Sequence, residues 1–129
     1  MVTLALVGII AALALPAYQR HVRRVNRSEA TVALYALLAE QERFHLRHGS
    51  YAAEVAAAPP AGLGIPVTTG GRRYSLVLAL SADGQSFIAT ATPTREGGQE
   101  SDSECLAFSV DHRGRRAVSG SGDVAACWR

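Results

Sequence analysis

Cysteine and histidine are the residues of this chain whose side chains could build a covalent or metal-bound centre. The 129 residues contain two cysteines, Cys105 and Cys127, both near the C-terminus. A disulfide between them would close a loop of a size that stabilises a fold by about 3 kcal/mol in the chain-entropy model. Disulfides persist in oxidising compartments, which favours an extracytoplasmic location for this part of the chain. We expect Cys105 and Cys127 to be bonded to each other.

The other candidates for chemistry do not combine into a centre. The acidic stretch at 102–104, "DSE", lacks the remaining ligands of a calcium loop and is expected to be a polar strand entry. No serine or cysteine nucleophile has a base that the sequence places beside it. The histidines have no second ligand at metal spacing; they are His21, His45, His48 and His112. The sequence therefore predicts no catalytic residue, no metal site and no cofactor, so we expect a protein that is not an enzyme.

Arginines gather beside two of the expected turns. Together they could form a basic patch that contacts DNA or another partner. The formal net charge of only +2 does not require such a partner, and arginines beside turns are more often solvated charge. We expect solvated side chains and keep DNA contact as the alternative; the residues are Arg72, Arg73, Arg113, Arg115 and Arg116.

The element that dominates the N-terminus is an uncharged apolar run. From residue 1 to 19 no side chain carries a charge, and as a helix this stretch measures about 28 Å, close to the roughly 30 Å of bilayer hydrocarbon. A core helix is disfavoured because the rest of the chain has too few apolar residues to surround it. A cleaved signal peptide fits the small residues Ala12 and Ala14 but lacks the basic region that should precede it. We expect residues 1–24 to form a membrane anchor whose apolar surface includes Leu4, Leu6, Gly8, Ile9, Ile10, Leu13, Leu15 and Pro16.

The charges that follow this run conflict with the cysteines over orientation. Arg20, Arg23, Arg24 and Arg27 would favour a cytoplasmic location for the C-terminal part, whereas a disulfide requires the outside. Basic residues in front of the apolar run would compete with these arginines and remove the conflict. We therefore expect a basic segment to precede residue 1.

The helix is predicted to continue beyond the arginines. Between Ala30 and His45, apolar residues recur at steps of three and four, with charged residues on the other faces. Gly49 suits the left-handed position that ends a helix. Pro16 should kink or loosen the membrane half rather than end it, because the pattern carries on past it.

The remainder reads as a loop followed by strands. Residues 50–71 are rich in Ala, Pro and Gly and predict a surface loop, with a turn of helix around 52–57 as a further expectation. Strands are predicted in "RRYSLVLAL", "SFIATATP", "CLAFSVD" and a weaker "RRAVSG". Three or four antiparallel strands over 72–129 with one apolar face match one amphipathic helix half. The expected fold class is α+β, a helix packed on a sheet, with 25–129 as the globular domain.

These motifs resemble those of a known family. The run "MVTLALVGIIAALALPAYQ", followed by Arg20, Arg23 and "RSEA", is similar to the N-terminal helix of type IV pilins and of type II secretion pseudopilins. The stretch "LAEQERFHLRHGSYA" resembles the end of that helix in type IV minor pilins. "YSL", "FIATATP", "DSECLAFSVDHRGR" and the terminal "CW" fall where minor pilins carry their sheet and C-terminal disulfide loop. The similarity covers nearly the whole chain, and the N-terminal helix is its most specific part.

The resemblance implies a structural subunit. Such proteins are cut and N-methylated by a prepilin peptidase, held in the inner membrane with the globular part in the periplasm, and then packed helix to helix in a filament. A minor pilin would take part in pilus assembly and hence in twitching motility, adhesion or DNA uptake. The alternatives are a type II secretion pseudopilin and a membrane-anchored binding module without a filament. The cysteine pair and "CW" end favour the pilin, because major pseudopilins commonly carry a calcium site instead.

The chain departs from the family pattern at its front. The basic leader, the glycine, the aromatic residue and the segment with a buried glutamate should lie directly before Met1. A start codon assigned too far downstream is the expected reason, and a truncated gene is the alternative. On the first explanation, the codons upstream should encode these residues.

Overall fold

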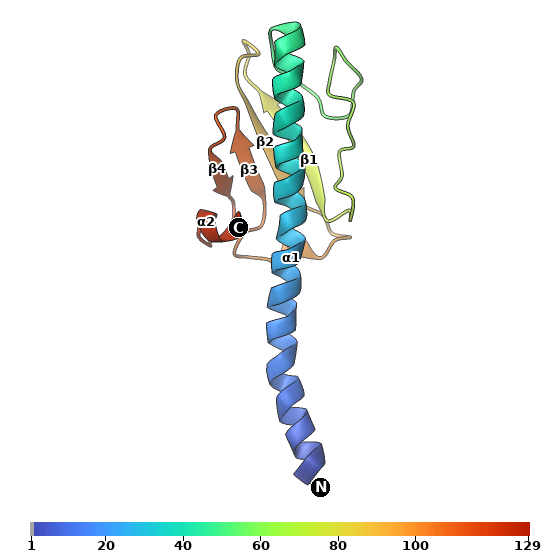
Figure 1. Cartoon of the computed structure of the whole chain (residues 1–129), viewed down its shortest axis with the longest axis vertical. Coiled ribbons are helices and arrows are strands. Elements are labelled where there is room, and N and C mark those ends of the chain that lie inside the picture. The colour runs from blue at the N-terminus through green and yellow to red at the C-terminus, as the bar shows by residue number, and fades with distance from the viewer. Residues whose placement is uncertain (1) are drawn as a thin grey trace.

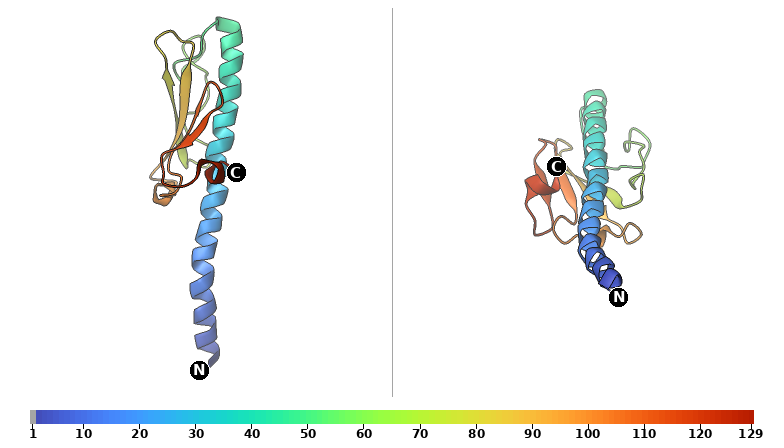
Figure 2. Two further views of the ribbon diagram at one scale, coloured as in Figure 1. Left: turned by 90° about the vertical axis from the view of Figure 1, so that its left-hand side faces the viewer. Right: turned by 60° about the horizontal axis from the view of Figure 1, so that its bottom comes forward.

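One long helix runs through the whole molecule and carries a small sheet on part of its length. The computed structural model describes residues 2–129, in which α1 spans Val2–His48 as a single helix of 47 residues. At 1.5 Å per residue it is about 70 Å long. The sheet lies against the C-terminal half of α1, whereas the N-terminal half projects away from the domain (Figures 1 and 2). Pro16 lies inside α1, and the helix continues past it as expected.

The two halves of α1 differ in what covers them. Every residue from 2 to 21 is exposed, and the first partly covered position is Val22. The N-terminal half is also long and apolar enough, by length and composition, to cross a membrane. The C-terminal half buries one stripe that follows the predicted three- and four-residue steps: Ala30, Thr31, Leu34, Leu37, Gln41 and Phe44.

The sheet is a four-stranded antiparallel meander. Its strands are β1 (Tyr74–Leu80), β2 (Phe87–Pro93), β3 (Phe108–Asp111) and β4 (Arg116–Val118), in the order β1-β2-β3-β4. Alternation of buried and exposed residues places one face of each central strand on the helix. The α+β architecture predicted from the sequence is confirmed.

Aromatic and aliphatic side chains from both layers fill the core. Leu34 and Leu37 of α1 are fully buried, as are Tyr74 of β1 and Phe108 of β3. The Tyr74 and Phe108 rings meet edge to face at 5.9 Å, a favourable geometry for aromatic pairs. The single tryptophan, Trp128, packs edge to face on Phe108 from the C-terminal end, so the chain terminus closes the core.

The end of α1 and the following loop test two local predictions. Gly49 follows the helix with φ of 74°, as expected for a left-handed helix end, and its amide donates to the His45 carbonyl oxygen. The helical turn expected over 52–57 is wrong. Gln41, fully buried, binds both backbone groups of Ala52, and the carbonyls of 54, 55 and 57 accept from residues 63–65 instead. These bonds hold the segment in a folded-back loop and use the groups that a helical turn would need.

Two short helices complete the C-terminal region. A 3₁₀ turn, η1 (Gln99–Ser101), lies in the β2–β3 connection, and α2 (Val124–Cys127) follows β4. Asp123 begins α2 because its carboxylate accepts from the Ala126 amide. Helix α2 lies near the level where α1 leaves the domain (Figure 1).

Candidate functional site

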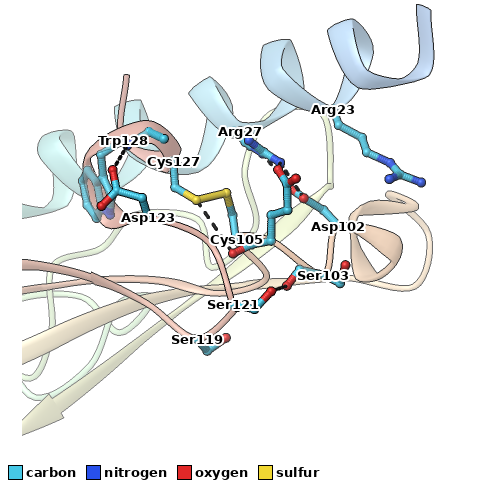
Figure 3. The surroundings of a disulfide bond; sticks show 12 residues. Arg23, Arg27, Asp102, Ser103, Cys105, Ser119, Ser121, Asp123, Cys127 and Trp128 are labelled. Atoms are coloured by element: carbon cyan, nitrogen blue, oxygen red, sulfur yellow. Dashed lines mark hydrogen bonds and ion pairs between the residues drawn. A yellow bond between two sulfur atoms is a disulfide. The ribbon is translucent and has the colours of Figure 1, made fainter. Parts of the chain in front are cut away.

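A disulfide fixes residues 102–127, called the disulfide loop below, at the end of the domain where α1 leaves it. Cys105 and Cys127 are bonded, with their Cα atoms 5.8 Å apart, and both are buried. The predicted pairing is confirmed. The bond ties α2 and the C-terminus to the segment that precedes β3 (Figure 3).

Glycine is required beside this disulfide because two backbone segments run in contact. The Gly120 amide donates to the Cys105 carbonyl, and the Gly122 amide donates to the Glu104 carbonyl at 2.7 Å. A Cβ atom on Gly120 would lie 2.2 Å from the Glu104 carbonyl oxygen, so a side chain cannot be accommodated without moving the backbone. The close approach holds the 104–105 backbone against the 120–122 backbone.

An ion pair joins this disulfide loop to α1. The Arg27 guanidinium donates to both carboxylate oxygens of Asp102 at 2.6 Å, and to Glu104 at 3.0 Å. Asp102 is 2% exposed, whereas the Glu104 side chain is mostly in solvent. The hydrogen bonds that Arg27 donates to Asp102 raise the pKa of Arg27 above its usual value despite partial burial, so Arg27 stays charged. The "DSE" stretch is thus a helix-binding segment and not only a polar strand entry.

A buried glutamine, Gln99, connects α1 to the sheet beside the Arg27–Asp102 pair. The Gln99 side chain accepts from the Asn26 amide at 3.1 Å and donates to the Tyr74 hydroxyl oxygen at 3.0 Å. Burial raises the pKa of Tyr74, so its hydroxyl remains protonated. Together with the Arg27–Asp102 pair, this contact locks the 99–104 segment onto α1.

Glu29 anchors the other side of the helix. Its carboxylate accepts hydrogen bonds from the Thr69 hydroxyl, from the Gly71 amide at 2.9 Å and from Arg73 at 2.7 Å. Burial alone would raise the pKa of Glu29, but these bonds outweigh it and hold the pKa below the usual value. One helical carboxylate thus positions the residues that lead into β1.

A basic cavity opens between α1 and the disulfide loop. It has a volume of about 280 Å³ and is lined by four arginines of α1 and by residues of the disulfide loop: Arg20, Arg23, Arg24, Arg27, Asp102, Ser103 and Glu104. The Arg23 side chain points away from Asp102, whose carboxylate is hydrogen-bonded to Arg27 (Figure 3). In the sequence, these arginines bore only on which side of the membrane the C-terminal part lies. Their proximity to the disulfide loop was not predicted.

The five arginines predicted as a candidate patch lie at two ends of the sheet. Arg72 and Arg73 precede β1, and the register places this end beside Pro93 of β2. The other three arginines lie in or next to the β3–β4 turn, at the opposite end, near Phe87. Antiparallel pairing separates the two groups by the length of β1, so they do not form one patch.

Most of these arginines also have local partners. Arg73 binds Glu29, and Arg72 lies 3.4 Å from Glu96 in an exposed pair. Asp111 organises the β3–β4 turn, since its carboxylate accepts from the amides of Arg113 and Arg115 and from the Arg115 side chain. These bonds lower the pKa of Asp111. Arg116 lies over the Trp128 ring at 5.9 Å. Of the two groups, the one at the β3–β4 turn therefore has more exposed arginines, three against one before β1.

Three of the four histidines contact other protein groups, and His21 is exposed on α1. His45 lies 3.2 Å from the Gln85 side-chain oxygen, and His48 lies 3.0 Å from the Phe44 carbonyl. His112 packs near the Tyr51 and Phe87 rings. Over residues 2–129, no three side chains of His, Cys, Asp or Glu come together in a way that could hold a metal ion.

The apolar residues predicted to form the anchor are exposed in the structure. Leu4, Leu13 and Leu15 are each at least 60% exposed, and a Cβ atom on Gly8 would meet nothing within 4 Å. The other members of the predicted set lie on the same uncovered stretch; they are Leu6, Ile9, Ile10 and Pro16. The globular domain of the same chain leaves all of them uncovered.

Comparison with known proteins identifies the family. Residues 16–109 match the sequence model of the family described as "Type IV minor pilin ComP, DNA uptake sequence receptor". The chain belongs to this family. This minor pilin is also 35% identical over 97 residues to the fimbrial protein EcpC of Eikenella corrodens, and the match covers 75% of the chain and 60% of EcpC. It therefore spans less than two thirds of that relative's length.

The fold agrees with a solved pilin. The chain superposes on a type IV pilin from Shewanella oneidensis with a TM-score of 0.52 at 24% identity, over 75% of this chain and 92% of that one. The helix, the antiparallel sheet and the disulfide are thus those of the pilin fold. The family is one of structural pilins and not of enzymes.

Proposed function

We propose that this minor pilin is an anchored subunit that enters a type IV pilus through the N-terminal half of α1. In this proposal residues 1–24 lie in the inner membrane, residues 25–129 form a periplasmic domain, and the whole subunit then joins other pilins in the filament. The observation that carries the proposal is that every residue from 2 to 21 is exposed. An apolar helix without intramolecular cover needs either lipid or other helices around it.

The small residues of this segment support close helix packing. Gly8, Ala11, Ala12 and Ala14 interrupt the larger side chains, and such positions allow helix backbones to approach each other in lipid or in a filament core. The same surface therefore suits both environments, as an assembling subunit requires.

A substitution at the centre of the apolar stretch tests the proposal. Leu13→Arg places a charge where lipid or neighbouring helices would surround it, at a cost of about 3 kcal/mol at a bilayer centre. We expect this variant to be lost from sheared pili and from the carbonate-resistant membrane fraction. Leu46→Arg is the matched control, because Leu46 lies on the same helix and is 84% exposed at the far end. Normal pilus incorporation of Leu13→Arg would contradict the proposal.

The family match favours a more specific role in DNA uptake. We infer that the exposed β3–β4 turn contacts DNA phosphate, because Asp111 holds this turn in shape and three arginines project from it: Arg113, Arg115 and Arg116. Arg72 and Arg73 are the weaker candidates, because only two arginines lie at that end of the sheet and the Arg73 side chain, held by Glu29, is 37% exposed. Arg115 is also paired, with Asp111, but its side chain stays 74% exposed. The globular part is not basic overall: ten arginines and eleven acidic residues follow residue 24. Binding would therefore depend on a local group and not on net charge.

DNA binding by variants of the full chain in detergent tests this role. Replacing the three β3–β4 arginines by glutamine should weaken duplex binding and reduce the slope of log K against log salt by about 0.9 for each phosphate that is no longer neutralised. The control replaces Arg43, Arg47 and Arg95 by glutamine, which removes the same charge elsewhere. Equal weakening in both triple variants would show a nonspecific charge effect and would exclude the turn as the contact site.

A further inference from the structure

We propose that Arg20, Arg23 and Arg24 form a binding site for the phosphate headgroup of an anionic phospholipid. The site is the cavity between α1 and the 102–104 segment of the disulfide loop. The inference rests on the proposed anchoring of this minor pilin in a membrane. It adds a specific lipid contact to the apolar helix that anchoring alone requires.

The ion pairs of the cavity leave three guanidinium groups for a ligand. Its lining has four arginines and two carboxylates, those of Asp102 and Glu104. Both carboxylates are held by Arg27, at 2.6 and 3.0 Å. Within residues 2–129, the side chains of the three remaining arginines make no ion pair. The positive potential of this cavity is therefore not cancelled by the protein itself.

The position of the three arginines along α1 matches the depth of lipid phosphates. They follow Gln19, the last residue of the uncharged run, by one to five residues, or about 1.5 to 7.5 Å of helix. The headgroup layer on each side of the hydrocarbon is about 5 to 7 Å thick. Arg27 lies about 12 Å beyond Gln19, outside this layer, where the protein supplies its partners.

The chemistry of the lining suits a phosphate diester. Guanidinium groups bind phosphate through paired N–H donors, and three of them lie on the α1 wall of the cavity. A lipid with a cationic choline group would bring a positive charge toward the arginines, so an anionic headgroup is favoured. Duplex DNA is the competing phosphate source, but the headgroup layer of the bilayer would exclude it from this depth.

Lipid retention by the full chain in detergent micelles tests the proposal. Micelles are supplemented with equal amounts of phosphatidylglycerol and phosphatidylcholine, and native mass spectrometry counts the bound lipids. We expect retained phosphatidylglycerol on the wild type. The R20Q/R23Q/R24Q variant should bind it about 100-fold more weakly, from a factor of about five for each arginine near an anionic surface. R20Q/R24Q, which changes two fully exposed side chains, should bind it about 25-fold more weakly and serves if the triple variant does not fold.

The control and the opposing outcomes separate this site from the anchor. R43Q/R47Q removes two arginines near the opposite end of the domain, matches R20Q/R24Q in charge, and should retain phosphatidylglycerol as the wild type does. Equal retention of both lipids, or unchanged retention in R20Q/R23Q/R24Q, would overturn the proposal. Displacement of phosphatidylglycerol by duplex DNA, with DNA binding abolished in the same variant, would reassign the site to DNA. Flotation with phosphatidylcholine vesicles at high salt measures the anchor alone, so its failure would count against the proposed function and not against the lipid site.

Discussion

The ion pair between Arg27 and Asp102 should contribute several kilocalories per mole to the stability of the domain. Arg27→Met removes the guanidinium and leaves the Asp102 carboxylate, 2% exposed, without its two hydrogen bonds. Breaking a buried pair in this way costs about 3–5 kcal/mol. Because Asp102 lines the basic cavity and can gain water there, we expect the low end, about 3 kcal/mol. At an m-value of about 1.5–2 kcal/mol/M, the urea midpoint should fall by roughly 1.5–2 M.

The partner substitution and a double-mutant cycle isolate the pair. Asp102→Asn should cost less, about 1–2 kcal/mol, because Arg27 keeps its bond to Glu104. The double variant should be more stable than the sum of the single changes predicts, with a coupling of about 1–2 kcal/mol. Unfolding can be followed by the fluorescence of Trp128, the single tryptophan, which packs on Phe108 in the core.

An exposed pair on the same helix provides the control. Arg43→Met breaks the pair between Arg43, whose side chain is 65% exposed, and Glu40, whose side chain is 39% exposed. This change should lower the free energy of unfolding by no more than about 0.5 kcal/mol. If Arg27→Met also costs less than about 1 kcal/mol, the burial argument is refuted. The disulfide loop would then be held to α1 by Gln99 and by the packing of Trp128 on Tyr35, and not by charge.

Three further outcomes follow from the same structure. Replacing Cys105 and Cys127 by serine should lower the free energy of unfolding by about 3 kcal/mol, and urea denaturation with and without reductant measures it; an unaltered midpoint would argue against the entropic account of the loop. Glu29 has a folded-state pKa below its unfolded value near 4.5, so its contribution is present above that pH and is lost as the pH falls through the folded-state value. Glu29→Gln should therefore flatten the acid limb of a stability profile, while Glu96→Gln, in an exposed pair, should not, and parallel profiles for both would contradict the assignment. A chain of residues 25–129 should be soluble and monomeric in sedimentation experiments, and membrane partitioning of that chain would place the anchor elsewhere.

Local patterns in the sequence determined the elements of this minor pilin. An uncharged run of membrane length, a three- and four-residue apolar period ending at Gly49, and four short strands are properties of neighbouring residues, and all appear in the fold. The cysteine pairing was also accessible, because Cys105 and Cys127 offer one intramolecular disulfide. Periodicity predicts such features because helices and strands repeat every few residues.

The contacts that define the surfaces were decided by the tertiary structure alone. Arg27 and Asp102 are 75 residues apart, and Glu29 meets Thr69 across 40 residues, distances over which the sequence carries no periodic signal. The expected turn at 52–57 failed for the same reason, since Gln41 on α1 captures the Ala52 backbone. Chain topology also divides the predicted arginine group, because antiparallel pairing sends the start of β1 and the β3–β4 turn to opposite ends of the sheet. The packing of the sheet on the helix places the arginines of α1 and residues 102–104 around one cavity. Which distant charges meet is set by that packing, and the order of residues along the chain does not reveal it.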